Sequence, residues 1–89
     1  MPSQMNPNVI PGVGRLLRQR RDDAGMTQAA LGEAVGLTQG AILHLETDRR
    51  APSLRVLVAI ADTLGCRVDD LIPARKINLK KNTPGIDKG

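Results

Sequence analysis

The feature that most restricts the fold of this chain is a two-residue connection, Gly36-Leu37, between two segments with helical character. Each of those segments begins with a threonine, Thr27 or Thr38, whose hydroxyl can accept a hydrogen bond from the first helical turn. Gly36 can take the left-handed conformation that a sharp turn between helices requires. Two helices joined at a steep angle by so short a turn predict a helix-turn-helix, whose second helix keeps an outer face available for contacts.

The rest of the chain extends this pair of helices into an all-helical domain. We expect a first helix from Val13 to Ala24, ended by Gly25, and a fourth helix after the capping residue Ser53. A short fifth segment, Val68 to Ile72, closes the domain at Pro73. The predicted fold class is therefore all-α, a compact bundle of five short helices that contains the helix-turn-helix.

The core of this bundle must be aliphatic, because none of the 89 residues is Phe, Tyr or Trp. Aliphatic side chains suit close packing of helices, and their helical spacing predicts which of them point inward. In the first three helices the inward residues are Val13, Leu17, Ala24, Leu31, Ala34, Val35, Ile42 and Leu45. In the fourth helix, which has the most regular spacing, they are Leu54, Leu57, Val58, Ala61 and Leu64.

The net charge of +4 does not lie in the predicted domain. Residues 13–73 carry eight arginines and eight acidic residues, whereas residues 74–89 hold five basic residues and one aspartate. Since solvated lysine-rich tails are common, overall basicity is weak support for a nucleic-acid partner. We divide the chain into a flexible N-terminal arm (1–12), the helix-turn-helix domain (13–73) and a basic C-terminal tail (74–89), in which Ile77 to Leu79 could form an edge strand or a dimer contact.

The outward side of the predicted helix from Thr38 to Glu46 has side chains that suit a DNA major groove. Gln39 can offer a bidentate amide to adenine, and His44 can donate or accept at a base edge. Gly40 offers no side chain there. Leu43 is apolar on the same side of the helix, where it would meet a thymine methyl group or face solvent.

A family resemblance is carried by residues that run in order from Leu16 to Ile72, roughly two thirds of the chain. They are Arg21, the segments 26–32 (Met-Thr-Gln-Ala-Ala-Leu-Gly) and 35–39 (Val-Gly-Leu-Thr-Gln), Ile42, Leu45-Glu46, Pro52-Ser53-Leu54 and 60–65 (Ile-Ala-Asp-Thr-Leu-Gly). On these residues the chain resembles the lambda-repressor-like, Cro/C1-type (XRE) family of DNA-binding domains. It departs from that family at Gly32, where the family usually has alanine.

The resemblance implies roles for individual positions. Gln28, at the start of the second helix, would hold a DNA phosphate with help from the helix dipole. Arg21 would form a partly buried ion pair with Glu46. Taking the residues and the resemblance together, we expect DNA base contacts from Thr38, Gln39, Gly40, Leu43 and His44. We expect DNA phosphate contacts from Thr27, Gln28, Thr47, Arg49 and Arg50.

The sequence contains no pattern that indicates catalysis or a cofactor. The single cysteine, Cys66, follows the helix-ending Gly65 and is interpreted as a small packing residue. One cysteine and one histidine offer no clustered zinc ligands, and the aspartate pairs at 22–23 and 69–70 splay to different faces instead of converging. We therefore expect no enzyme and no metal. The lack of a signal-like apolar run and of paired cysteines favours a cytoplasmic, nucleoid-associated protein.

The leading hypothesis is a sequence-specific transcriptional regulator, either a repressor or an autoregulator. It would bind double-stranded DNA as a homodimer, with the helix 38–46 in the major groove. The dimer contact is expected near Val68, Leu71 and Ile72. The alternative is an antitoxin-type interaction module that masks a toxin protein and binds its own promoter. The balanced charge of the domain and the presence of Gly40 keep that alternative open.

Overall fold

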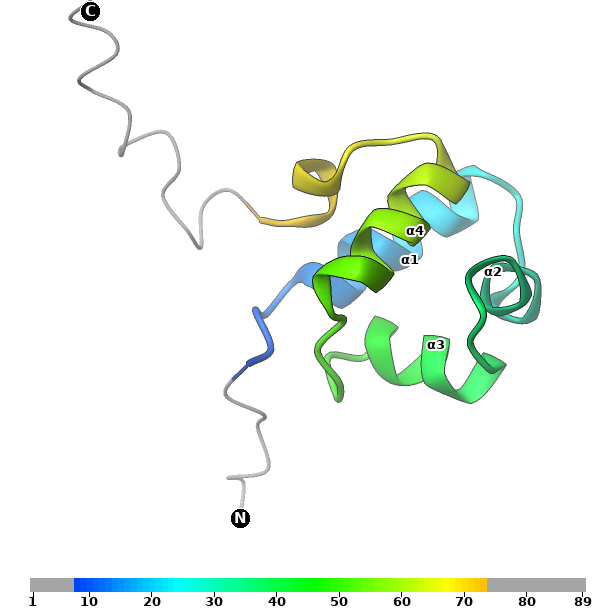
Figure 1. Ribbon diagram of the computed structural model, residues 1–89. Helices are drawn as coiled ribbons and strands as arrows, with labels where there is room; N and C mark the ends of the chain where they lie inside the picture. The colour runs from blue at the N-terminus through cyan, green and yellow to red at the C-terminus, as the bar shows by residue number, and fades with distance from the viewer. Residues whose placement is uncertain (1–7, 74–89) are drawn as a thin grey trace, which may run out of the picture.

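The structure, a computed structural model, describes residues 8–73, and its elements are all helical (Figure 1). The four α-helices are α1 (Val13–Asp23), α2 (Gln28–Val35), α3 (Gln39–Glu46) and α4 (Leu54–Leu64), followed by the 3-10 helix η2 (Val68–Leu71). The all-α fold is confirmed over these residues, with four α-helices instead of the expected five. Residues 1–7 and 74–89, which include the segment Ile77 to Leu79, lie outside the described part of the chain.

The expected fifth helix is a single 3-10 turn because the segment is too short for an α-helix. Its backbone N–H groups bond three residues back, from Asp70 to the Arg67 carbonyl at 3.0 Å and from Ile72 to the Asp69 carbonyl at 3.3 Å. Bonds of this spacing close a tighter turn than an α-helix and suit segments of three or four residues. The turn still supplies a core residue, since Leu71 is fully buried.

Local capping determines where three of the α-helices begin. The hydroxyl oxygens of Thr27, Thr38 and Ser53 accept hydrogen bonds from the backbone N–H three residues later, at 3.0, 3.0 and 3.1 Å. Each such cap stabilises its helix by about 1 kcal/mol. Gly36 and Gly65 follow α2 and α4 with φ of 78° and 72°, in the left-handed region that glycine occupies without steric cost. These caps and stops confirm the prediction from the sequence.

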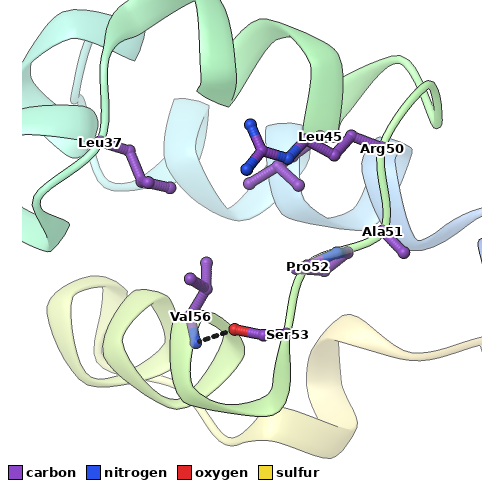
Figure 2. Close-up of a pocket in the computed structure, with 7 residues that line it drawn as sticks. All are labelled: Leu37, Leu45, Arg50, Ala51, Pro52, Ser53 and Val56. Carbon is purple, nitrogen blue, oxygen red and sulfur yellow. Dashed lines mark hydrogen bonds between the residues drawn. The ribbon is translucent and has the colours of Figure 1, made fainter.

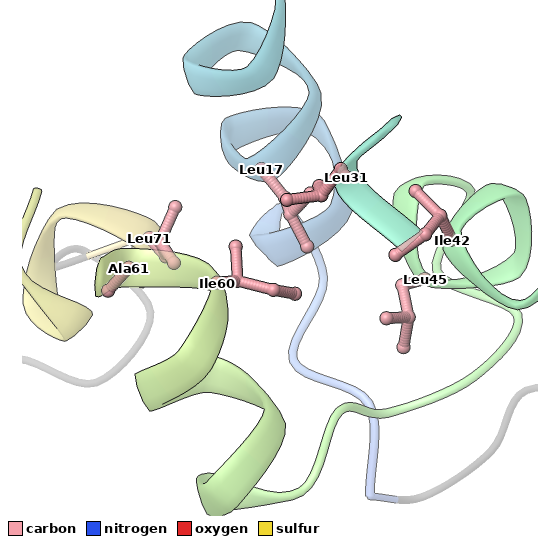
Figure 3. Packing of buried hydrophobic residues seen from close by; sticks show 7 residues of the cluster. All are labelled: Leu17, Leu31, Ile42, Leu45, Ile60, Ala61 and Leu71. Carbon is pink, nitrogen blue, oxygen red and sulfur yellow. The ribbon is translucent and has the colours of Figure 1, made fainter. Parts of the chain in front are cut away.

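The core gathers side chains from every element (Figure 3). Its seven buried members are Leu17, Leu31, Ile42, Leu45, Ile60, Ala61 and Leu71. α2 packs against both α3 and α4, while α1 packs against α3 and η2. This packing leaves α3 along one edge of the fold, with one side against the core and the other facing outward (Figure 1). No helix among residues 8–73 has both the length and the apolar composition needed to cross a membrane.

The buried face of α4 differs from the face that the spacing predicted. Leu54 is 70% exposed and Val58 is 45% exposed, so both predicted inward positions are wrong. The core contacts of α4 come from Val56, Leu57, Ile60, Ala61 and Leu64. Because all but three residues of α4 are apolar, two neighbouring stripes satisfy the helical repeat. Packing against α2 and η2 selects the stripe that contains Ile60.

Two alanines that were expected to point inward are also exposed, Ala24 and Ala34. α1 ends at Asp23, so Ala24 is the residue that caps its C-terminus. α2 buries Gly32 against the rest of the fold. Since two residues of an α-helix rotate the side-chain direction by about 200°, Ala34 is turned outward.

α1 and the end of α3 approach each other closely at Gly14. A Cβ atom at Gly14 would lie within 2.6 Å of the carbonyl oxygens of Leu45 and Glu46. Glycine is therefore required by the backbone contact and not by the conformation of α1, which is helical at this residue. The contact joins the first turn of α1 to the last turn of α3.

Asp48 strengthens the same junction from the loop after α3. Its carboxylate accepts hydrogen bonds from the backbone N–H groups of Gly12 at 3.0 Å and Gly14 at 2.9 Å, and so caps α1. Asp48 itself has a φ of 57°, a left-handed conformation that aspartate tolerates. The packed region therefore extends to residues before Val13, which the sequence analysis placed in the arm. No local signal indicates this cap, since it joins residues 34 and 36 positions apart.

Replacing Gly14 with alanine is expected to destabilise the protein, although alanine is the better helix former by about 1 kcal/mol. The added methyl group must displace the backbone at the end of α3, and overpacking of this kind costs about 1–3 kcal/mol. Thermal unfolding followed by circular dichroism measures the change. Gly40→Ala is the matched control, because a Cβ atom at Gly40 would have its nearest neighbour at 4.0 Å. The control should melt at the same or a higher temperature, and a rise for Gly14→Ala as well would contradict the close approach.

Candidate nucleic-acid interface

α3 buries Ile42 and Leu45 and turns its opposite side outward. The residues that the sequence analysis assigned to base contacts are exposed on that side or at its beginning. They are Thr38, Gln39, Gly40, Leu43 and His44, and we call them the α3 outer face. The structure therefore brings all five into one surface on a single helix.

Glu46, the last residue of α3, is held by Arg21 of α1. The Arg21 guanidinium donates through Nε to Glu46 Oε2 and through Nη2 to Glu46 Oε1, the second bond being 3.0 Å long. Its Nη1 donates to the Met26 carbonyl at 2.7 Å. The side chains of Arg21 and Glu46 are only 9% and 2% exposed, so the expected ion pair is present and deeply buried. The hydrogen bond to Glu46 raises the pKa of the Arg21 guanidinium, which keeps this group charged.

Glu46 also orients Gln28, in the first turn of α2. Gln28 Nε2 donates to Glu46 Oε1 at 3.0 Å, and Gln28 Oε1 accepts from Gln39 Nε2 at 3.2 Å. A chain of hydrogen bonds therefore runs from the buried Arg21 to the exposed Gln39. It leaves Gln39 one N–H and its carbonyl oxygen for a partner. The sequence indicated Gln28 and Gln39 as separate contacts, because the bond between them depends on the angle of the turn.

The loop after α3 folds back onto the end of that helix. The backbone N–H groups of Arg49 and Arg50 bond to the His44 carbonyl at 2.9 and 3.2 Å. The Thr47 hydroxyl donates to a carbonyl of α3 one turn earlier, at 2.9 Å. Within residues 8–73, no ion pair involves the side chains of the two arginines. The loop thus holds, next to the α3 outer face, two positively charged side chains that form no ion pair with the described residues.

The two arginines of this loop differ in their surroundings. Figure 2 shows the side chain of Arg50 extended alongside Leu45, over a cavity of about 120 Å³ between α3 and the start of α4. The other lining residues are Leu37, Ala51, Pro52, Ser53 and Val56, and Arg49 is not among them. The aliphatic stem of Arg50 therefore covers apolar surface in addition to carrying a charge.

Gly32 brings α2 against the turn that precedes α3. A Cβ atom at Gly32 would lie 2.5 Å from the Leu37 carbonyl oxygen and 3.2 Å from that of Thr38. The Leu37 N–H in turn bonds to the Gly32 carbonyl at 2.8 Å. Gly32 stands where the family usually has alanine. In this structure the backbone contact leaves no space at that position for the methyl group of alanine.

Cys66 packs against the core and is half-buried. Burial raises the pKa of its thiol, which disfavours the reactive thiolate at neutral pH. This environment agrees with the packing role that its sequence context indicated. Among residues 8–73, no group of three His, Cys, Asp or Glu side chains is placed to hold a metal ion.

Arg21→Met is expected to destabilise the protein by about 3–5 kcal/mol, because it leaves the Glu46 carboxylate buried without its cation. The double variant Arg21→Met/Glu46→Leu should regain most of that loss, since replacing both charges removes the desolvation penalty as well. Urea unfolding of the wild type and of the single and double variants measures the three free energies. A double variant that is no more stable than Arg21→Met would contradict the role of the pair.

Comparison with known protein families gives a match to the helix-turn-helix family over residues 17–71. An HTH-type transcriptional regulator of Methanothermobacter thermautotrophicus is 44% identical over 50 residues, which cover 56% of this chain and 72% of the relative. The match spans every helix described above except the first turn of α1. Similarity to known proteins therefore coincides with the packed domain.

Solved structures give the same result. The P22 c2 repressor protein, in complex with a synthetic operator, has a TM-score of 0.64 and 35% identity over 67% of this chain and 91% of the solved repressor chain. Hydroxypropylphosphonic acid epoxidase from S. wedmorenis has a TM-score of 0.69 and 29% identity over 76% of this chain, but over only 36% of the enzyme. The likeness to the enzyme is thus restricted to one part of a longer protein. On the geometry of its helices and the family match, this chain belongs to the helix-turn-helix family of the Cro/C1 type.

Proposed function

We propose that this protein is a DNA-binding transcriptional regulator that inserts α3 into the major groove. The observation that carries the proposal is the α3 outer face, in which Gln39 is held by Gln28 and, through Gln28, by the buried Arg21–Glu46 pair. An α-helix fits the major groove, and an oriented amide in the groove can read adenine. The P22 c2 repressor, which this fold resembles, was solved in complex with an operator, and this likeness supports the same mode of binding.

In this mode of binding, the start of α2 and the loop after α3 face the DNA backbone. The helix dipole favours a phosphate beside Gln28, in the first turn of α2. The proposed phosphate contacts are Thr27, Gln28, Thr47, Arg49 and Arg50. The two arginines bind phosphate without breaking an internal ion pair of the described residues. Phosphate contacts supply affinity, and the α3 outer face supplies the sequence preference.

A second copy of the chain completes the proposed complex. Two copies on a two-fold symmetric operator place their α3 helices in successive major grooves, about 34 Å apart. The dimer contact that the sequence analysis placed near Val68, Leu71 and Ile72 stays a prediction. Leu71 is fully buried within one copy, so only the partly exposed Val68 and Ile72 have surface to offer a second copy.

Selection of bound fragments from a random DNA pool tests this proposal as a whole. The expected product is an inverted repeat whose half-sites lie about 10 base pairs apart, since two-fold symmetry and groove spacing impose that geometry. The recovered duplex is then titrated by gel shift at two salt concentrations. Absence of any enriched sequence, together with no binding at about 50 mM salt, would overturn the proposal, because non-specific binding is strongest at low salt.

Gln39→Ala and Arg49→Ala should separate base reading from phosphate contact. Gln39→Ala should weaken binding to the selected operator by about tenfold or more and leave binding to random DNA nearly unchanged, because a bidentate amide discriminates between bases. Arg49→Ala should weaken binding to both DNAs and make the negative slope of log affinity against log salt shallower by about one. Fluorescence anisotropy across a salt series measures both effects. Equal losses on the two DNAs for Gln39→Ala would contradict base reading by this residue.

No specific observation favours the other functions that were considered. The toxin-masking alternative was kept open by the balanced charge of the domain and by Gly40, and neither feature identifies a protein partner. The enzyme among the structural neighbours resembles this chain over only 36% of its own length. We therefore propose a regulator without enzymatic activity, which acts in the cytoplasm on the DNA of the cell.

A further inference from the structure

At the centre of the α3 outer face lies an apolar side chain, Leu43. The proposed recognition of adenine by the Gln39 amide does not involve it. Leu43 is 43% exposed, whereas Ile42 and Leu45, the other large apolar residues of α3, are buried. An exposed leucine forfeits the stabilisation that burial would provide. Its neighbours on the outer face are Gln39, one turn earlier, and His44, the next residue. The helix therefore presents an apolar group between two polar ones.

The surface beside Leu43 is open. Gly40 lies one turn before it, and a Cβ atom at Gly40 would have its nearest neighbour, the Thr38 hydroxyl oxygen, at 4.0 Å. On the other side, the hydroxyl of Thr47, the residue after α3, donates to the Leu43 carbonyl at 2.9 Å. This hydroxyl therefore faces the backbone of α3. A base edge that approaches Leu43 therefore meets a leucine side chain bordered by glycine.

The largest apolar group in the major groove is the 5-methyl group of a pyrimidine. Thymine carries this methyl group, and methylation of cytosine at C5 places a methyl group at the equivalent position. The other base edges present hydrogen-bonding atoms, which would lose water against a leucine side chain without gaining a partner. An apolar side chain at this place in the groove therefore favours a 5-methylpyrimidine over every other base edge.

We infer that Leu43, together with the open surface at Gly40, selects a pyrimidine with a 5-methyl group in each half-site. This inference rests on the proposed function, because it concerns how the α3 outer face reads DNA. It divides the reading between two side chains, with Gln39 contacting an adenine edge and Leu43 contacting the methyl group. Four residues of helix separate them by about 6 Å along the axis, so the two contacts fall on different base pairs.

Deoxyuridine tests the inference, because it differs from thymidine only by the missing methyl group. In the selected operator, each thymine of a half-site is replaced in turn by deoxyuridine, and affinity is measured by fluorescence anisotropy. At one position the wild-type protein should lose about fourfold in affinity, the value of one buried methyl group. Leu43→Ser should show no loss at that position, and Leu43→Met, which keeps an apolar side chain, should retain the loss.

A second series of duplexes carries 5-methylcytosine in place of each cytosine of the half-site. A loss with deoxyuridine identifies thymine as the base that is read, and a gain with 5-methylcytosine identifies methylated cytosine. Leu54→Ser is the matched control, since it changes an exposed leucine on α4 and should respond as the wild type does.

The inference and the function on which it rests fail in different ways. If the wild type binds the operator but responds to neither base series, or if Leu43→Ser responds as the wild type does, the methyl-reading role is overturned and DNA binding stands. If the wild type binds no duplex at all, both are overturned.

Discussion

The hydrogen-bonded ion pair between Arg21 and Glu46 is the interaction on which the rest of this arrangement depends. Glu46 is the residue at which α1, α2 and α3 meet. Its carboxylate accepts hydrogen bonds from Arg21 and Gln28, and its backbone carbonyl lies against Gly14 with no space for a side chain between them. A pair this deeply buried adds little net stability compared with apolar residues of the same volume. Its directional bonds, however, join α1, α2 and α3 through one carboxylate.

The same pair determines how the α3 outer face is presented. Glu46 holds Gln28 and Gln28 holds Gln39, so an exposed amide is connected to a buried charge by two hydrogen bonds. A side chain that is already oriented loses less conformational entropy on binding. Asp48 acts in a comparable way on the loop, since its cap on α1 holds the segment that carries Arg49. The side chains proposed for base contacts and those proposed for phosphate contacts are thus both positioned from the α1–α3 junction.

Much of the fold could be predicted because its signals act over a few residues of chain. The three hydroxyl caps, the glycine stops and the turn at Gly36-Leu37 each depend on neighbours in sequence, and each is present. The spacing of residues in α3 also placed its outer face correctly. The face of α4 could not be predicted in this way, because an almost entirely apolar helix satisfies the same spacing with Leu54 and Val58 outward or inward. Only the neighbours of α4 decide between the two.

By itself, the sequence determined a set of short capped helices, a sharp turn between two of them and the side chains available on α3. The tertiary structure decided which of those side chains are held in place. The bond between Gln28 and Gln39 and the cap of Asp48 on α1 join residues from 11 to 36 positions apart. Such bonds require the helices to be packed at particular angles first. Helical periodicity specifies which side of a helix a residue occupies, and it carries no information about those angles.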